Sequence, residues 1–255
     1  MDLSNFYSHK KRLSYHPSST VTLKRTGLKK YFAYDDRFST VTEEIVSLVK
    51  KSDTRSLKVL DVGVGDAIYE RLLPDNIFKK IEFYGIDISV KQLKRSGKYL
   101  KQLKAVDLNK ESIPYKNNVF NVVIISEVLE HVFFPEKVIA EAVRVLKKPG
   151  YLLITYPNSG ALQLRLSLLF TGRSPLLNYP QNLEHIRFFS KEDILSMIES
   201  DLELFKYQGL SSLLFDTWNF PITFKLFMPR FLQVFCNKFF PSFALGNLMV
   251  FKKWN

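Results

Sequence analysis

The sequence contains one cysteine among its 255 residues, Cys236. A single cysteine excludes an internal disulfide bond, and the lack of a Cys-x-x-Cys pair or a Cys/His cluster argues against structural zinc. No apolar run approaches the roughly 20 residues of a membrane-spanning helix, and no apolar core of a secretory signal follows Met1. We therefore expect a cytoplasmic protein in a reducing compartment.

Acidic residues are also in short supply, because 25 Asp and Glu stand against 37 Lys and Arg, which leaves a net charge of +12. This surplus favours polyanionic partners such as nucleic acid, phosphorylated substrates or an anionic membrane surface. Residues 1–30 hold seven basic residues and only Asp2 as an acid, which is half of the surplus. A solvated basic tail explains this segment equally well.

Short apolar segments alternate with helical patterns along the rest of the chain, after an amphipathic helix expected over residues 36–51. The expected strands cover residues 58–63, 82–87, 103–106, 120–125, 151–155, 202–208 and 244–251, and the expected helices cover 67–73, 135–146 and 191–200. This alternation predicts an α/β fold, a doubly wound and mostly parallel seven-stranded sheet of Rossmann-like type with helices on both faces.

Two units follow from this pattern. Residues 1–55 form an N-terminal basic segment with a cover helix, and residues 56–255 form the main domain. Insertions at about 158–185 and 210–243 interrupt the alternation. Both follow strand ends, where ligands bind in open α/β sheets, so we expect them to be helical covers over a substrate.

A glycine pair marks the turn from the first strand into its helix, in Asp61-x-Gly63-x-Gly65-x-Ala67. Glycines there let the backbone approach a ligand closely. A dinucleotide fingerprint needs a third glycine where Ile68 stands, so a nicotinamide or flavin cofactor is disfavoured. Asp87 ends the second strand, where a carboxylate can accept hydrogen bonds from both hydroxyls of a ribose.

Several ordered motifs resemble the class I S-adenosylmethionine-dependent methyltransferases over about residues 57–157, namely VLDVGVGDAIYERLL, FYGIDIS, AVDLNKESIPYKNNVFNVVIISEVLEHV and LKKPGYLLITYPN. A weaker resemblance is found in NLEHIRFFSKEDILSMI at 182–198. The resemblance implies S-adenosylmethionine as the cofactor, bound around Asp61 by Gly63, Gly65, Asp87, Ile88, Asp107 and Ser126. It implies that Gly63 and Gly65 meet the methionine part and that Asp87 meets the ribose.

The same resemblance implies that Ile88 packs on the adenine, that Asp107 approaches its amino group, and that Ser126 lies beneath the sulfonium. The sequence departs from the family at two positions. Ala67 stands where a third glycine is frequent, and Val64 stands where cysteine is frequent. Because alanine is the smallest possible change from glycine, we expect cofactor binding to survive.

Ser126-Glu127-Val128-Leu129-Glu130-His131 follows the fourth strand, and in a helix Glu127, Glu130 and His131 would share one face. Three hypotheses remain open. His131 can act as a general base toward a hydroxyl. All three residues can bind a divalent metal, as in the ubiquinone-biosynthesis O-methyltransferases that this stretch resembles. The segment can also be an ordinary capped helix start. His185 is the second catalytic candidate, although it equally suits a structural role in its loop.

Residues 210–243 are rich in aromatic residues, with ten in 34 positions: Phe215, Trp218, Phe220, Phe224, Phe227, Phe231, Phe235, Phe239, Phe240 and Phe243. This segment suits either an ordinary lid or an apolar surface for a lipid-like substrate or a membrane interface. Basic residues in the two insertions and near them suit anionic head groups: Arg165, Arg173, Arg187, Lys225 and Lys238. The stretch from Tyr156 to Pro175 also resembles methyltransferase-like proteins associated with methionine biosynthesis, which suggests a cover for a substrate or partner.

Taken with the resemblance, these features predict methyl transfer from S-adenosylmethionine to an oxygen of a small-molecule, glycan-linked or lipid-linked acceptor. A non-catalytic methyltransferase-like binding subunit and an RNA methyltransferase are the alternatives. After the fourth strand the chain lacks the Asn/Asp-Pro-Pro-aromatic element of enzymes that methylate amino groups of bases, so nucleic acid is disfavoured as a substrate.

Overall fold

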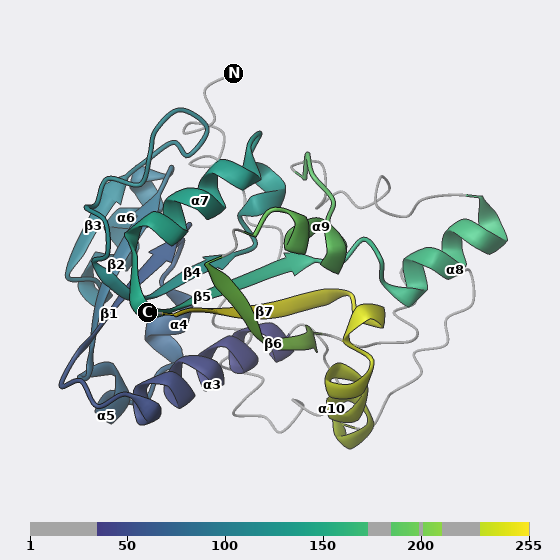
Figure 1. Cartoon of the computed structure of the whole chain (residues 1–255), viewed down its shortest axis with the longest axis horizontal. Coiled ribbons are helices and arrows are strands. Elements are labelled where there is room, and N and C mark those ends of the chain that lie inside the picture. Colours follow the sequence, from purple (N-terminus) through teal and green to yellow (C-terminus); the bar gives the residue numbers. More distant parts are fainter. Residues whose placement is uncertain (1–34, 173–184, 199–200, 211–229, 255) are drawn as a thin grey trace.

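The computed structural model describes residues 35–172, 185–198, 201–210 and 230–254. The expected tail at 1–30, and the parts of the two insertions at 173–184 and 211–229, lie outside the described residues. In Figure 1 the described elements form a central sheet with helices on both of its faces. The expected α/β class is confirmed.

The sheet has seven strands in the order β3-β2-β1-β4-β5-β7-β6. Their bounds are β1 Leu57–Val62, β2 Ile81–Asp87, β3 Gln102–Ala105, β4 Phe120–Ser126, β5 Leu146–Pro157, β6 Leu202–Leu210 and β7 Gly246–Lys253. Strands β1 to β5 pair in parallel, whereas β7 runs antiparallel to β5 and β6. The chain reverses its direction of winding between β1 and β4, and such a switch point is where open α/β sheets bind ligands.

The described helices of four residues or more are α3 Asp35–Lys51, α4 Ile68–Leu72, α5 Asp75–Phe78, α6 Val90–Ser96, α7 Pro135–Val145, α8 Leu162–Thr171, α9 Lys191–Ser196 and α10 Arg230–Phe239. Short 3-10 turns, η2 Gly97–Tyr99, η3 Leu129–His131 and η6 Pro241–Phe243, complete the described helical structure. Two of these helices begin at a serine cap. Ser89 accepts a hydrogen bond from Gln92 N at the start of α6, and Ser190 forms a capping box with Asp193 at the start of α9.

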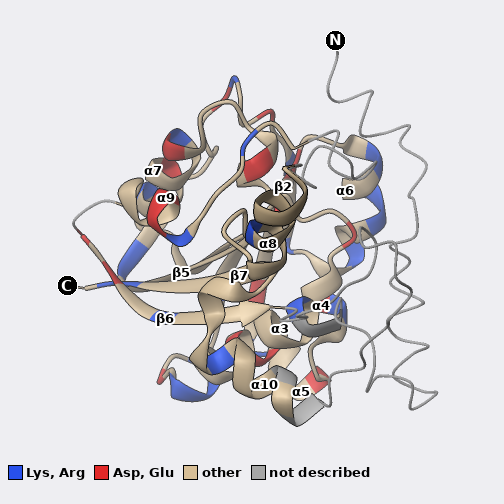
Figure 2. Ribbon diagram, turned by 90° about the vertical axis from the view of Figure 1, so that its right-hand side faces the viewer, with Lys and Arg blue, Asp and Glu red and all other residues tan. Residues whose placement is uncertain are grey.

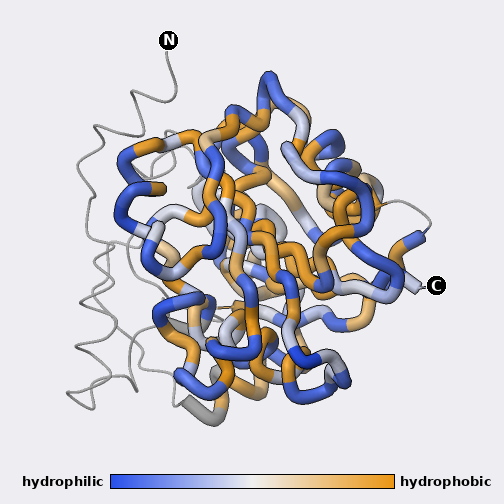
Figure 3. The backbone as a smooth tube through the Cα atoms, turned by 90° about the vertical axis from the view of Figure 1, so that its left-hand side faces the viewer, coloured by the Kyte–Doolittle hydropathy of each residue, from blue (hydrophilic) through white to orange (hydrophobic). Residues whose placement is uncertain are grey.

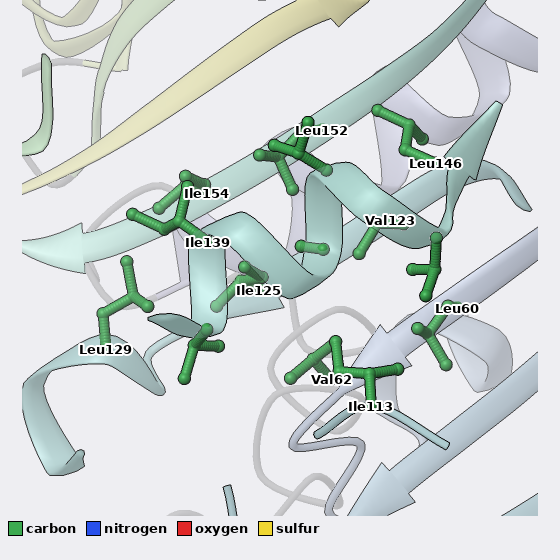
Figure 4. Close-up of a cluster of buried hydrophobic side chains, with 14 of the residues drawn as sticks. Leu60, Val62, Ile113, Val123, Ile125, Leu129, Ile139, Leu146, Leu152 and Ile154 are labelled. Carbon is green, nitrogen blue, oxygen red and sulfur yellow. The ribbon is translucent and has the colours of Figure 1, made fainter. Parts of the chain in front are cut away.

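The sheet buries both of its faces, because successive side chains of a strand point to opposite sides. On one face, α3, α4 and α5 pack over alternate strand residues such as Val59, Ile124 and Val250. On the other face, α7 and α9 pack over Val62, Ile125 and neighbouring residues. Figure 4 shows Ile139 of α7 close to Ile125 and Ile154 of the central strands.

Hydropathy follows the same layering. Figure 3 shows hydrophobic stretches concentrated in the strands at the centre of the molecule, with hydrophilic turns around them. The buried positions of α7, Val138, Ile139, Ala142, Val143 and Val145, recur at helical spacing. Each fully buried Val or Ile side chain contributes about 1.5–3 kcal/mol, so this helix fixes one face of the central strands.

Strand β5 differs most from its prediction, because it begins at Leu146 rather than at Tyr151. Leu146 pairs with Phe120 of β4, next to a shift in the register of the two strands. Because of this pairing, the Lys147–Gly150 stretch lies within β5. The strand therefore follows α7 directly, five residues earlier than the predicted strand at 151–155. Helix α9 is also shorter than predicted and ends at Ser196 rather than at residue 200.

Candidate functional site

The glycine loop between β1 and α4 has the backbone geometry of a tight ligand-binding turn. Gly63 and Gly65 have positive φ angles of 74° and 51°. A Cβ atom at Gly63 would lie 2.4 Å from Cγ2 of Val128, so a side chain there is excluded by space as well as by conformation. The contact also places the segment after β4 directly against the glycine loop.

Ala67 occupies the position where the resembled family frequently has a third glycine. It also adopts a left-handed conformation, with φ 54° and ψ 52°. An L-residue in this region costs roughly 1–2 kcal/mol. The Ala67 side chain is fully buried beside Val64 and Leu93, and this packing helps to hold the strained turn. The departure from the family pattern is therefore accommodated without a change in the backbone.

Asp87 joins the ends of β1 and β2. Its Oδ2 atom accepts a hydrogen bond of 2.9 Å from Gly65 N, and its Oδ1 atom accepts one of 2.7 Å from Ser89 N. Burial raises the pKa of the Asp87 carboxyl, and the two backbone donors oppose that shift. The carboxylate thus holds the glycine loop against the start of α6.

Two further acids lie buried under this loop, Asp61 on β1 and Glu70 on α4, each about 2% exposed. Burial raises the pKa of Asp61 well above its usual value, and the charges of Glu70 and Asp87 raise it further. Burial also raises the pKa of Glu70 to about 7. Neither carboxylate oxygen of Glu70 has a hydrogen-bond partner within the described structure.

A chain of polar side chains crosses the carboxyl ends of the central strands. The hydroxyl oxygens of Tyr69 and Ser126 are 2.5 Å apart, and those of Ser126 and Thr155 are 2.8 Å apart. The Thr155 hydroxyl donates a hydrogen bond of 3.1 Å to Glu127 Oε1, and Glu127 Oε2 forms an ion pair of 2.8 Å with Arg37. Helix α3 therefore contributes a charged side chain to this edge of the sheet.

Residues 126–131 do not form the helix in which Glu127, Glu130 and His131 would share one face. Glu127 has a φ angle of 53°, outside the helical region, and only the 3-10 turn η3 follows it. Strain of this kind, typically about 1–3 kcal/mol in a non-glycine residue, recurs at functional sites. Because Glu127 turns toward Arg37 and Thr155, it does not share a helical face with Glu130 and His131.

Glu130 and His131 instead meet the other predicted histidine, His185. The Glu130 Oε1 atom lies 3.9 Å from Nε2 of each histidine, and the two imidazole rings pack edge to face with centroids 4.8 Å apart. Burial raises the pKa of Glu130 well above its usual value, the charge of Glu127 adds to this, and Arg37 opposes it. The structure thus brings together two candidate residues that are 54 positions apart in the sequence.

Ile88 and Asp107 follow β2 and β3 at the same edge of the sheet, and Ile88 is half-buried. The Asp107 carboxylate accepts a hydrogen bond of 3.1 Å from Asn109 N and forms an ion pair of 3.0 Å with Lys110. The roles that the resemblance implies for these residues remain predictions.

Arg37, Tyr69, Glu70 and Thr155 were not singled out in the sequence. Thr155 stands near the carboxyl end of β5, so the rule that ligands bind at strand ends is the signal that can find it. The other three side chains belong to helices whose apolar pattern says only that one face is buried. Their polar contacts depend on which strand ends those helices cover.

The described helices of the two insertions, α8 and α10, bury three of their polar side chains. On α8, Gln163 and Ser167 are buried, and on α10, Asn237 is buried. Large apolar side chains face outward, with 43–74% of their surface exposed: Leu168, Leu169 and Phe170 of α8, Val234, Phe235 and Phe239 of α10, and Phe240 and Phe243 beside η6. We call these eight residues the apolar rim.

The elements that carry the apolar rim are neighbours, because η6 contacts both α8 and α10. Figure 1 places both helices at the end of the sheet to which β4 and β5 point, and Figure 2 shows them largely free of charge. Two basic groups border the rim. Arg165 lies 5.9 Å from the ring centroid of Phe243, and Lys238 lies 5.5 Å from that of Phe239. Within the described part of the chain, no helix has the length and apolar content to cross a bilayer.

Comparison with known proteins agrees with this architecture. Residues 60–154 match the family model of a methyltransferase domain. An uncharacterized protein of Methanocaldococcus jannaschii is 36% identical over 123 residues, which are 48% of this chain and 51% of that protein. The mitochondrial ubiquinone biosynthesis O-methyltransferase of Candida albicans is 27% identical over 195 residues, 73% of this chain and 56% of that enzyme.

Among solved structures, magnesium protoporphyrin IX methyltransferase from Synechocystis with bound SAH matches with a TM-score of 0.58 and 13% identity, covering 98% of each chain. This likeness concerns the fold. The chain spans about half the length of the two relatives described above.

The strand order and the glycine loop agree with the methyltransferase domain whose family model residues 60–154 match. S-adenosylmethionine is the cofactor of the class I methyltransferases that these residues resemble.

Proposed function

We propose that this chain binds S-adenosylmethionine at the glycine loop and transfers its methyl group to an oxygen of a small-molecule, glycan-linked or lipid-linked acceptor. The observation that carries the proposal is Asp87, whose carboxylate clasps the glycine loop at the end of β2. A carboxylate can accept about four hydrogen bonds, so Asp87 retains capacity for two ribose hydroxyls.

The residues around the loop fit this cofactor. Gly63 and Gly65 form a turn with positive φ angles and no side chains, which supports a close approach of the methionine part to the backbone. Asp61 and Glu70 supply buried acidic groups beneath the loop, which suit a ligand that carries positive charge on its sulfonium and ammonium groups. We assign the remaining contacts as the resemblance implies: adenine to Ile88 and Asp107, and the neighbourhood of the sulfonium to Ser126.

Calorimetric titration with S-adenosylmethionine and its demethylated product tests the cofactor site. We expect Asp87→Ala to weaken binding by about 1.5–3 kcal/mol, the range for hydrogen bonds to a charged group. Asp53→Ala, at an exposed aspartate before β1, is the matched control and should bind as wild type does. A folded wild-type protein that ignores both ligands at millimolar concentration would refute the proposal.

We assign removal of the acceptor's proton to the cluster of Glu130, His131 and His185. When bound, S-adenosylmethionine supplies an activated methyl group, so the chain's residues mainly have to position the acceptor oxygen and take its proton. The proximity of Val128, two residues before Glu130, to Gly63 of the glycine loop supports this assignment. An imidazole has a usual pKa near 6.5, which suits proton transfer at neutral pH.

The apolar rim favours a lipid-linked or lipid-like acceptor among these classes. Helices with polar residues inside and aromatic residues outside are unusual for a protein surface, where contiguous apolar patches mark contacts with proteins, membranes or ligands. Arg165 and Lys238 beside the rim, and the net charge of +12, match the negative charge of anionic head groups. We therefore propose that the rim docks on an anionic bilayer from which the acceptor is taken.

Liposome sedimentation tests the docking. Binding should rise with the share of anionic lipid and fall with salt, since each basic residue near the surface contributes about 1 kcal/mol that salt screens. Phe235→Ser with Phe239→Ser should reduce binding and leave the fold intact, because both rings are about half exposed. Trp254→Ser is the control, because Trp254 is equally exposed but follows the last residue of β7, whereas η6, beside the rim, precedes the first residue of that strand. If the wild-type protein does not sediment with anionic liposomes, the docking proposal is refuted and a soluble acceptor is favoured.

A further inference from the structure

Glu130, His131 and His185 present one carboxylate and two imidazoles to a common point. One ligand atom from each residue can be chosen so that all three lie within 4.8 Å of one another. The two distances from Glu130 Oε1 to the histidine Nε2 atoms are both 3.9 Å. This separation is too long for direct hydrogen bonds, which need about 2.7–3.2 Å.

The backbone holds these residues in place. Ile186 N and Arg187 N both donate hydrogen bonds to the Glu130 carbonyl oxygen, at 2.9 and 3.2 Å. The segment that carries His185 is therefore fastened to the turn that carries His131, although the two segments belong to different parts of the chain. The cluster is built by tertiary structure rather than by one flexible loop.

The carboxylate of Glu130 supplies a second, independent observation. Its side chain is 1% exposed, and neither of its oxygens has a hydrogen-bond partner in the described structure. A buried polar group without a partner is costly, and native structures rarely leave one. These oxygens face the two imidazoles, so a ligand between the three side chains would satisfy them.

We propose that Glu130, His131 and His185 bind a divalent metal ion of the zinc type and leave one coordination position open. Two histidines, one carboxylate and an open position form a ligand set that zinc uses in catalytic sites. Tetrahedral bonds of about 2.0–2.1 Å place neighbouring ligand atoms about 3.4 Å apart. The side chains must therefore close by about half an ångström at the two contacts of 3.9 Å, and by more at the widest pair.

The ligand set differs from a metal site built on Glu127, Glu130 and His131. Glu127 is already engaged by Arg37 and Thr155, whereas His185 approaches the cluster from the segment before α9. At the open position the ion would hold the acceptor oxygen and lower its pKa, so that the proton passes to water, and the two histidines would then serve as ligands in place of the direct proton transfer proposed above. This role rests on the proposed methyl transfer, but the binding of the ion does not.

The test uses the full chain after dialysis against a chelator, with zinc titrated by calorimetry and Co²⁺ added as a spectroscopic probe. We expect one ion per chain. We expect Glu130→Gln and His185→Ala each to weaken zinc binding at least about tenfold, because each removes one of three protein ligands. Glu127→Gln is the matched control and should change zinc affinity by less than about threefold, because the Glu127 carboxylate lies among other partners.

His185→Cys tests the same site by the appearance of a new spectroscopic band rather than by weaker zinc binding. Thiolate coordination adds a sulfur-to-cobalt charge-transfer band to the Co²⁺ spectrum, and the wild-type chain, with Cys236 in place, should lack that band. The affinity for S-adenosylmethionine is measured for every variant. An unchanged affinity shows that the variant is folded and that its cofactor site is intact. Absence of stoichiometric zinc binding in the wild type overturns the metal site and leaves the cofactor proposal standing. The metal site is also overturned if Glu127→Gln weakens zinc binding while His185→Ala leaves zinc binding unchanged.

Discussion

Replacing Glu70 by glutamine should make the protein more stable above neutral pH. Glu70 is 2% exposed on the short helix α4, and both of its carboxylate oxygens lack hydrogen-bond partners in the described structure. Burial raises its pKa from 4.5 to about 7. The ionised side chain is therefore an unfavourable group in the folded state, and glutamine keeps its shape without its charge.

The size of the effect follows from the pKa difference. Below about pH 4.5 the carboxyl is protonated in both states, so it contributes no pH dependence. Between about pH 4.5 and 7 the unfolded chain releases the proton and the folded chain retains it, so the free energy of unfolding falls as the pH rises. At 1.36 kcal/mol per unit the loss approaches about 3 kcal/mol. Asp61 also lowers the free energy of unfolding as the pH rises, because burial and the charge of Glu70 raise the pKa of its carboxyl.

Urea denaturation of the wild type and Glu70→Gln at a series of pH values measures this difference. We expect the two proteins to be similar near pH 4.5 and the variant to be about 3 kcal/mol more stable near pH 8. Glu136→Gln, at an exposed glutamate of α7, is the control and should follow the wild type. A difference between wild type and Glu70→Gln that stays constant from about pH 5 to 8 would refute the reasoning.

Two further predictions concern the strained backbone of the site. Ala67→Val should destabilise the fold by about 2 kcal/mol or more, because a β-branched residue is forced into a buried left-handed turn. Ala67→Gly should stay within about 1 kcal/mol of wild type, since relief of strain offsets the lost methyl packing and the added chain entropy; equal denaturation midpoints for both variants would contradict this account. Arg37→Met should lower global stability by no more than about 1 kcal/mol, because Arg37 and Glu127 are 22% and 25% exposed. Hydrogen exchange at the first turn of α3 should nevertheless accelerate several-fold, and unchanged exchange there would show that this ion pair does not hold α3.

Local pattern determined the elements of the fold. The apolar run Val122–Ile125 is typical of a strand buried on both faces, and it lies in the central strand β4. Ser89 and Ser190 cap the helices that their positions predict, since capping depends on residues three positions away. The predicted boundaries failed at β5, where pairing with Phe120 extends the strand past Lys147.

The same division applies to the site. The residues of the glycine loop and Asp87 could be predicted, because turn geometry and the end of a strand are properties of short segments. The partners of Glu127 could not, because they depend on a left-handed backbone and on Arg37 from a helix some 90 residues earlier. The exposure of the apolar side of α10 could not be predicted from the sequence either. A helical pattern shows which residues share a face, but it does not show which face is buried.

By itself, then, the sequence determined the α/β alternation, the glycine turn and the acid at the end of β2, because these arise from interactions over a few residues. Only the tertiary structure decided that His185 joins Glu130 and His131. Hydrogen bonds from Ile186 N and Arg187 N to the Glu130 carbonyl bring the two segments together, and they are made only once both have packed at the same edge of the sheet.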